Sequence, residues 1–143
     1  MKYAYRLETR KVKEPDFPYS SELLNSPETV VAFVRALQDS DIEKMMVLFL
    51  NSRNRLICVW IQPGTINSAV VYAREIAKHA ILSGAVAVIL VHNHPTGDPQ
   101  PSQEDKALTK GIADALNLLQ IIVFDHILLG ENSHFSFKEN QIL

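Results

Sequence analysis

The sequence predicts one α/β domain in which helices flank a mixed β-sheet. Continuous apolar runs of strand length alternate with amphipathic segments of helical period. The chain has 143 residues, of which 47% are hydrophobic, and this is enough for a single core. The predicted order β, α, β, β, α, β, α, β, β is typical of a layered α/β fold. We assign residues 26–143 to this domain and residues 1–25 to an N-terminal extension made of a strand and a linker.

In the extension, Tyr3, Tyr5 and Leu7 alternate with polar residues, which predicts an edge strand, and Pro15 and Pro18 mark the linker. The extension is locally basic, with Lys2, Arg6, Arg10, Lys11 and Lys13. A nucleic-acid-binding arm would explain these cations. We favour a solvated edge strand whose charges protect it from aggregation.

The first helix of the domain begins at Ser26-Pro27-Glu28, where a serine cap precedes a proline in the first turn. Its predicted inward face carries Val30, Phe33, Val34 and Leu37. The apolar runs 45–50 and 56–61 flank the turn 51–54 and predict a β-hairpin with both strands largely buried.

A second helix is expected from Asn67 or Ser68 to Leu82, followed by a buried strand over residues 85–91. Its predicted inward face is rich in small residues and consists of Ala69, Tyr72, Ala73, Ile76, Ala77, Ala80 and Ile81. A third helix is expected over residues 102–118, with Leu108, Ile112, Ala115 and Leu119 on its buried face. Short strands 121–124 and 127–129, split by Asp125-His126, and a last strand at 135–137 complete the chain.

Composition excludes several classes of protein. The net charge of -2 gives no indication of a nucleic-acid partner or an anionic membrane. The only cysteine, Cys58, excludes an internal disulfide and a cysteine-based zinc ribbon, and we interpret it as a small buried hydrophobe in a reducing compartment. The first residues lack the apolar run of a signal peptide, and the longest apolar run, 85–91, is too short for a bilayer. We therefore expect a cytoplasmic protein.

The loop after the third predicted strand carries two histidines, His92 and His94, at alternate positions. Alternate side chains of an extended backbone share a face, and Pro95 keeps His94 extended. Two imidazoles are therefore expected to point to one place.

Ser102 and Asp105 open the next helix in the pattern of a capping box. However, Asp105 lies three residues before Leu108 and seven before Ile112, on the inward face of the helix. Its carboxylate is thus expected to point toward the histidines. Capping and metal binding compete for this side chain.

Two histidines and one carboxylate leave a fourth position open, which is typical of catalytic zinc. Water in that position has its pKa lowered from about 15.7 to about 7. A non-haem iron site uses the same ligand types and stays an alternative. A zinc deaminase is excluded, because it requires a Pro-Cys-x-x-Cys segment.

A hydrolytic zinc site also needs a general base, for which Glu43 and Glu75 are the main candidates. Glu43 stands at the mouth of a buried strand, where a lone acid is otherwise poorly placed. Glu75 lies in the middle of a helix beside Arg74, where an ion-paired surface acid is common. We favour Glu43.

These residues resemble a known family. Glu43, His92-x-His94, Ser102 and Asp105 match the JAMM motif of the JAB/MPN metalloprotease superfamily. More closely, HNHPTGDPQPSQED resembles the HNHPSGDPxPSxxD segment of the RadC family, and FDHILLG resembles its DHIIIG segment. The resemblance runs from about Ser26 to the end. It implies an MPN (JAB-like) single domain with a cytidine-deaminase-like layer architecture.

The resemblance also implies the roles of the site residues. One Zn²⁺ would be held by His92, His94 and Asp105 with water as fourth ligand, Glu43 would be the general acid/base, and Ser102 would stabilise the oxyanion. The implied activity is that of a metallopeptidase or isopeptidase acting on a peptide or protein substrate. The alternatives are a non-catalytic MPN-type interaction module and a DNA-repair-associated factor.

The chain departs from the RadC pattern in two places. Tyr72-Ala73 replaces a His-Pro pair. The 25 residues before Ser26 are too few for the helix-hairpin-helix region of longer RadC proteins. This second departure argues against DNA tethering by such a region.

Overall fold

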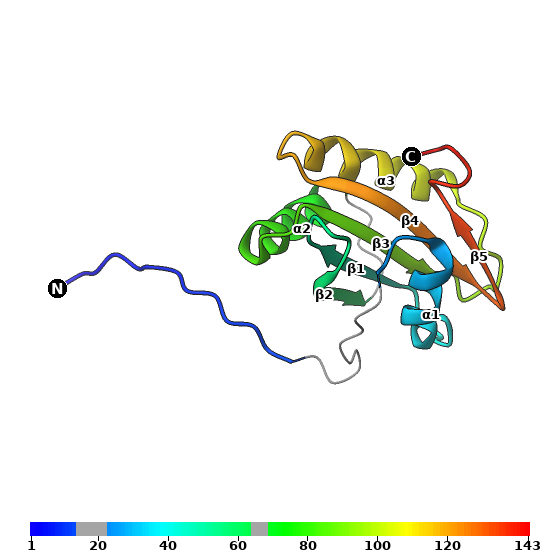
Figure 1. Cartoon of the computed structure of the whole chain (residues 1–143), viewed down its shortest axis with the longest axis horizontal. Helices are drawn as coiled ribbons and strands as arrows, with labels where there is room; N and C mark the ends of the chain where they lie inside the picture. Colours follow the sequence, from blue (N-terminus) through cyan, green and yellow to red (C-terminus); the bar gives the residue numbers. More distant parts are fainter. Residues whose placement is uncertain (14–22, 64–68) are drawn as a thin grey trace.

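The computed structural model describes residues 1–13, 23–63 and 69–143 (Figure 1). Within these ranges, eight elements follow one another. They are α1 (Pro27–Gln38), β1 (Lys44–Leu50), β2 (Leu56–Pro63), α2 (Ala69–Ser83), β3 (Ala87–Asn93), α3 (Gln103–Asn117), β4 (Ile122–Gly130) and β5 (Ser133–Ser136). None of these helices is long and apolar enough to cross a membrane.

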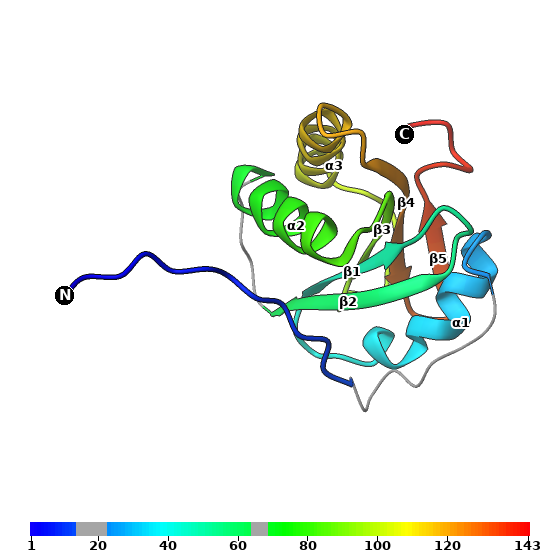
Figure 2. The same ribbon diagram turned by 60° about the vertical axis from the view of Figure 1, so that its left-hand side comes forward.

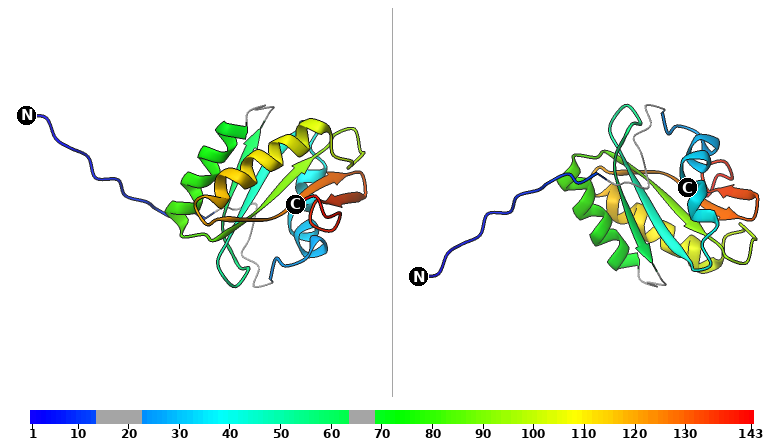
Figure 3. Two further views of the ribbon diagram at one scale, coloured as in Figure 1. Left: turned by 90° about the horizontal axis from the view of Figure 1, so that it is seen from above. Right: turned by 90° about the horizontal axis from the view of Figure 1, so that it is seen from below.

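The five strands form one mixed sheet in the order β2-β1-β3-β4-β5. The β1–β2, β1–β3 and β4–β5 pairs are antiparallel, whereas β3 and β4 are parallel and joined by the crossover helix α3. Helices α2 and α3 lie side by side on one face of the sheet, and α1 covers the other face (Figures 2 and 3). The predicted class, a mixed sheet flanked by helices, is confirmed.

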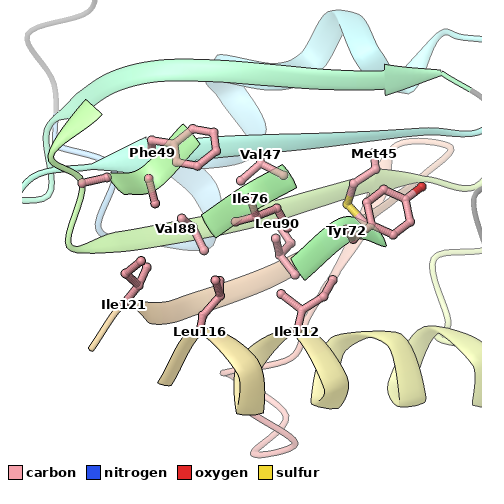
Figure 4. Close-up of a cluster of buried hydrophobic side chains, with 12 residues drawn as sticks. Met45, Val47, Phe49, Tyr72, Ile76, Val88, Leu90, Ile112, Leu116 and Ile121 are labelled. Atoms are coloured by element: carbon pink, nitrogen blue, oxygen red, sulfur yellow. The ribbon is translucent and has the colours of Figure 1, made fainter. Parts of the chain in front are cut away.

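The central strands are continuously apolar because both faces of the sheet are buried. In β1, Met46, Leu48 and Leu50 pack with α1, whereas Met45, Val47 and Phe49 pack with α2 and α3. On the face covered by α2 and α3, side chains of these two helices interdigitate with those of the sheet around Ile76, Leu90 and Ile112 (Figure 4). Tyr72 belongs to this core, so one of the two residues that depart from the RadC pattern has a packing role.

The strand predicted around Tyr3–Leu7 is absent, because residues 1–13 form neither helix nor strand. The side chains of Tyr3 and Leu7 are exposed. The alternation of apolar and polar residues predicts a strand here, but this segment does not pair with the sheet. The predicted linker, and the predicted start of the second helix at Asn67 or Ser68, lie outside the described residues.

The break predicted at Asp125-His126 is also wrong, since β4 runs through both residues without interruption. Each side chain is buried and has a hydrogen-bonding partner inside the domain, so neither ends the strand. Two residues predicted to face inward, Ile81 and Leu119, are exposed. Leu119 lies beyond the last residue of α3, and Thr109 and Leu116 take the buried positions instead.

The topology brings distant parts of the chain to one edge of the sheet. Because β1 runs antiparallel to β3, the start of β1 lies beside the end of β3, with Met45 opposite His92. The crossover then returns α3 over the sheet with its N-terminus at the same edge. In open α/β sheets, ligands bind at the carboxyl ends of parallel strands, which is where the polar residues gather.

Candidate metal centre

His92 belongs to β3 itself, where it pairs with Met45 of β1 and Leu128 of β4. His92 is buried, and each of its ring nitrogens faces a carboxylate oxygen. Nε2 lies 2.9 Å from Oε1 of Glu43, and Nδ1 lies 3.4 Å from Oδ1 of Asp105. The inner nitrogen, Nδ1, is buried and has no hydrogen-bonding partner among the described residues.

His94 follows the end of β3 and is oriented by the backbone around it. Its main-chain N–H donates to the carbonyl of Leu129 (2.8 Å), and its Nδ1 lies 2.8 Å from the carbonyl oxygen of Asp98. A carbonyl only accepts, so Nδ1 carries a proton and Nε2 is the nitrogen that a metal can bind. Metal-bound histidines commonly donate their second nitrogen in this way. Nε2 faces Oδ2 of Asp105 at 3.2 Å.

Two glycines hold the loop that carries His94 against the end of β4. The N–H of Glu131 donates to the carbonyl of Gly97 (2.9 Å). A Cβ on Gly130 would lie only 2.4 Å from that carbonyl oxygen, so a side chain there would push the loop away. Gly97 also has a φ of +89°, a conformation that favours glycine.

Asp105 is fixed by the start of α3. Ser102 is the N-cap, its Oγ accepts from the N–H of Asp105 (3.0 Å), and Oδ2 of Asp105 accepts from the N–H of Ser102 (2.9 Å). Asp105 therefore completes the capping box and faces the histidines with the same side chain. Burial alone would raise the pKa of Asp105, but its contacts with His92 and His94 and the Ser102 N–H hold this pKa well below its ordinary value.

The same contact acts on His94 in the opposite direction. The Asp105 carboxylate raises the pKa of the His94 imidazole, against a smaller opposing effect of burial, and the Asp98 carbonyl adds to the increase. In the metal-free protein, this contact favours the protonated imidazole beside the Asp105 carboxylate, an arrangement that a cation would replace. Metal-binding side chains commonly carry protons in the metal-free protein and release them when the ion binds.

Glu43 reaches the site from the residue before β1 and is half-buried. Its position depends on Asn93, a buried residue between the two histidines. The Asn93 side chain accepts from the N–H of Lys44 (2.7 Å) and donates to the carbonyl of Ile42 (2.9 Å). These two bonds bracket Glu43 and hold its backbone against the end of β3.

Among the described residues, one group of three can hold a metal ion, and it consists of Glu43, His92 and His94, with ligand atoms within 4.8 Å of one another. Asp105 lies beside it. The 3.2 Å between its Oδ2 and Nε2 of His94 is close to the spacing of about 3.3 Å between neighbouring ligands of tetrahedral zinc. The donor set of imidazoles and carboxylates suits zinc. The buried, unpartnered Nδ1 of His92 shows that the polar groups here are incompletely satisfied without a further group.

The remaining predicted residues separate clearly. Ser102 is exposed and caps α3, and its hydroxyl hydrogen donates to no described residue. Glu75 is not part of the group, because it lies on α2 and pairs with Lys78 (2.7 Å). That pairing lowers the pKa of the Glu75 carboxyl. Of the two candidate bases, the structure brings only Glu43 to the histidines.

Sequence reasoning missed three buried polar residues of the site: Asn93, Thr109 and His126. Asn93 could have been found as the amide inside the pattern His-Asn-His at a buried strand end. Thr109 occupies the helical position one turn after Asp105, on the same face of α3. His126 carried the opposite signal, since a polar residue inside an apolar run was interpreted as a break.

Comparison with known proteins places this arrangement in a family. The model of the RadC-like JAB domain matches residues 24–142. The chain belongs to the RadC-like JAB domain family. A UPF0758 protein of Haemophilus influenzae (strain PittEE) is 45% identical over 126 residues, which are 87% of this chain and 57% of that protein. A UPF0758 protein of Desulforamulus reducens is 42% identical over 123 residues, which are 85% of this chain and 54% of that protein.

The RadC-like JAB domain therefore accounts for nearly the whole chain, including the histidine loop and Glu43. The chain spans about half the length of the curated relatives it matches. The names of these relatives describe no activity.

Proposed function

We propose that this protein is a zinc-dependent hydrolase, a metallopeptidase or isopeptidase that cleaves an amide bond in a peptide or protein substrate. The observation that supports it is the convergence of two oriented imidazoles and two different carboxylates at one sheet edge. Membership of a JAB domain family agrees with this chemistry. When bound, zinc polarises a carbonyl and lowers the pKa of a coordinated water.

In this proposal, His92, His94 and Asp105 hold the ion. Each is supported by a different element: β3 carries His92, the Gly97 turn carries His94, and the cap of α3 carries Asp105. Support from three rigid sources keeps the ligands in place before the ion arrives. Pre-organisation of this kind reduces the entropy that binding would otherwise cost.

Glu43 is the general base in this proposal, because its carboxylate contacts His92 but is not one of the three assigned metal ligands. It is less buried than Asp105, and the backbone of its segment is held by Asn93. It can therefore accept a proton from the attacking water and deliver it to the leaving amine. Ser102 lies at the same helix terminus, where its free hydroxyl hydrogen can donate to the oxyanion that develops on the substrate carbonyl.

The test compares the wild type with Glu43→Gln and with Glu75→Gln as a matched control, since Glu75 is a half-buried acid of the same type on α2, away from the histidines. Metal content is measured after purification without added zinc. Cleavage of a proteome-derived peptide library is followed by mass spectrometry.

We expect one zinc per chain in all three proteins. Glu43→Gln should lower the cleavage rate by a factor of about 10² to 10⁴, the usual contribution of a general base, and Glu75→Gln should leave it unchanged. A wild type that holds zinc but cleaves no more than Glu43→Gln would indicate a non-catalytic interaction module. A wild type that binds no metal would contradict the site itself.

A further inference from the structure

The two histidines of the site differ in the environment of their second nitrogen. The Nδ1 of His94 donates to the carbonyl of Asp98, which leaves Nε2 for a metal. The Nδ1 of His92 is buried and makes no hydrogen bond with a described residue. The carboxylate oxygen that faces it at 3.4 Å, Oδ1 of Asp105, belongs to a residue that the proposed function assigns to the metal. Because metal-bound histidines are oriented by a hydrogen bond from the second nitrogen, His92 needs an acceptor on its inner side.

The candidate acceptor is His126 of β4, a fully buried residue. It lies next to Leu90 of β3, two residues along from the partner of His92, so both imidazoles are on the face covered by α3. The rings of His92 and His126 stack at 6.2 Å between centroids, with 25° between their planes. The opposite face of His126 stacks on Phe137 at 4.8 Å.

The protonation of His126 follows from Thr109. The Thr109 hydroxyl lies 2.7 Å from the carbonyl oxygen of Asp105 and 2.6 Å from Nδ1 of His126. The carbonyl can only accept, so the hydroxyl donates its single hydrogen there, and Nδ1 of His126 must donate to the hydroxyl oxygen. The Nε2 of His126 is then an unprotonated acceptor. Burial, which lowers the pKa of His126 to about 3, agrees with a neutral ring.

Nε2 of His126 and Nδ1 of His92 are the two buried side-chain polar atoms without a partner in the described part of the chain. One is an acceptor, the other can be a donor, and they belong to stacked rings. Two such atoms in the interior of a domain are expected to satisfy one another. A single buried water commonly bridges polar groups that are too far apart for direct contact.

We propose that His126 is a positioning residue for the metal centre. One buried water accepts a hydrogen bond from the N–H of His92 Nδ1 and donates one to Nε2 of His126, and this holds the His92 ring with Nε2 toward Glu43 and the metal. Asp105 and Thr109 lie one helical turn apart on α3. Asp105 faces His92, and Thr109 is hydrogen-bonded to His126, the neighbouring histidine on the sheet. The inference rests on the proposed function, because it assigns His92 as a zinc ligand.

The test uses His126→Phe, which retains an aromatic ring between His92 and Phe137 but removes the acceptor. Zinc affinity is measured by competition with a chromophoric chelator. We expect affinity to fall 10- to 100-fold, the usual effect of losing such a support. The matched control is Phe137→Leu, which changes packing on the other face of His126 without removing a polar group, and it should bind zinc as the wild type does.

A second variant and a direct measurement cover the case in which His126→Phe does not fold. His126→Gln offers an amide oxygen near the position of Nε2 and should bind zinc more tightly than His126→Phe. Nitrogen-15 NMR of the imidazoles should show His126 protonated at Nδ1 in metal-free protein, and His92 protonated at Nδ1 with Nε2 on the metal in zinc-loaded protein. Zinc bound to Nδ1 of His92, or wild-type affinity in a folded His126→Phe, would overturn the proposal.

These outcomes are distinct from failure of the proposed function. A wild type that binds zinc but cleaves no peptide refutes the hydrolase and leaves the affinity ratio to decide the role of His126. A wild type that binds no zinc refutes the metal site, and the proposal for His126 with it. In that case the metal-free spectrum still shows whether Nε2 of His126 carries a proton.

Discussion

Two buried aspartates, Asp105 on α3 and Asp125 on β4, show that burial of a carboxylate does not by itself indicate a catalytic or metal site. Asp125 accepts from the N–H of His126 (2.7 Å), the N–H of Lys138 (3.0 Å) and the hydroxyl of Ser136 (2.6 Å). All three donors are neutral, and they tie β5 and the segment after it to β4. Asp105 instead faces two imidazoles, which can exchange their protons for a metal.

The kind of donor therefore separates a structural carboxylate from a ligand. A hydroxyl or backbone N–H has a hydrogen that it keeps, so these groups hold Asp125 as a hydrogen-bond acceptor. An imidazole can offer a lone pair as readily as a hydrogen. Asp105 consequently sits where a cation gains three partners at once.

The largest effect is expected for Asp105→Asn. The amide oxygen can still accept from the Ser102 N–H, so the cap of α3 and the fold should persist. Zinc content should fall below one per chain, and peptide cleavage should fall by a factor of about 10³ or more, since the ion supplies most of the electrostatic stabilisation. Metal analysis and thermal melting check this. Full zinc content in the variant would make Asp105 a capping residue only.

Asp125→Ala should show the reverse pattern. It leaves the Ser136 hydroxyl and two backbone N–H groups without their acceptor in the interior, and hydrogen bonds to a charged group contribute about 1.5–3 kcal/mol each. We expect the free energy of unfolding to fall by at least about 4 kcal/mol, near the lower end of three such contributions, as measured with urea. Zinc content of the folded protein should stay at one per chain. Loss of zinc without loss of stability would place Asp125 with the metal ligands.

The contrast between these aspartates also explains what the sequence could predict. The positions of His92, His94 and Asp105 could be predicted from the sequence, because they depend on local geometry, namely strand alternation, a proline and the phase of one helix. Glu43 needed only the antiparallel pairing of β1 with β3. The roles of Asp125 and His126 depend on Ser136 and Thr109, which lie on other elements, and no periodic pattern contains such pairs.

Errors at the ends of elements have a related cause. The apolar pattern that correctly places Ile76 and Ile112 in the core also predicts that Ile81 and Leu119 are buried, but both are exposed. An amphipathic period describes a helix face but not where the neighbouring sheet ends. Similarly, the alternation of Tyr3, Tyr5 and Leu7 predicts a strand only if a partner strand is available, and the edges of this sheet are formed by β2 and β5.

The smallest effect concerns pH, and it tests whether Asp105 has a titrating partner. Asp105 has its pKa lowered from 3.8, so the stability it contributes is present above about pH 4 and is lost as pH falls further. His94 has its pKa raised from 6.5, so its contribution is complete below about pH 6.5 and is lost as pH rises through the raised value. Both contributions depend on the contact between them.

The free energy of unfolding of metal-free wild type, minus that of metal-free Asp105→Asn, should therefore be greatest between about pH 4 and pH 6.5 and decrease on both sides. Urea titrations in the presence of a chelator, from pH 3 to pH 9, measure this difference. The donors to Asp125 are a hydroxyl and backbone amides, which do not titrate in this range, so only Asp105 has a partner that can switch its charge. A difference that is flat across pH would mean that His94 and Asp105 do not form an ion pair, and would remove the feature that distinguishes the two aspartates.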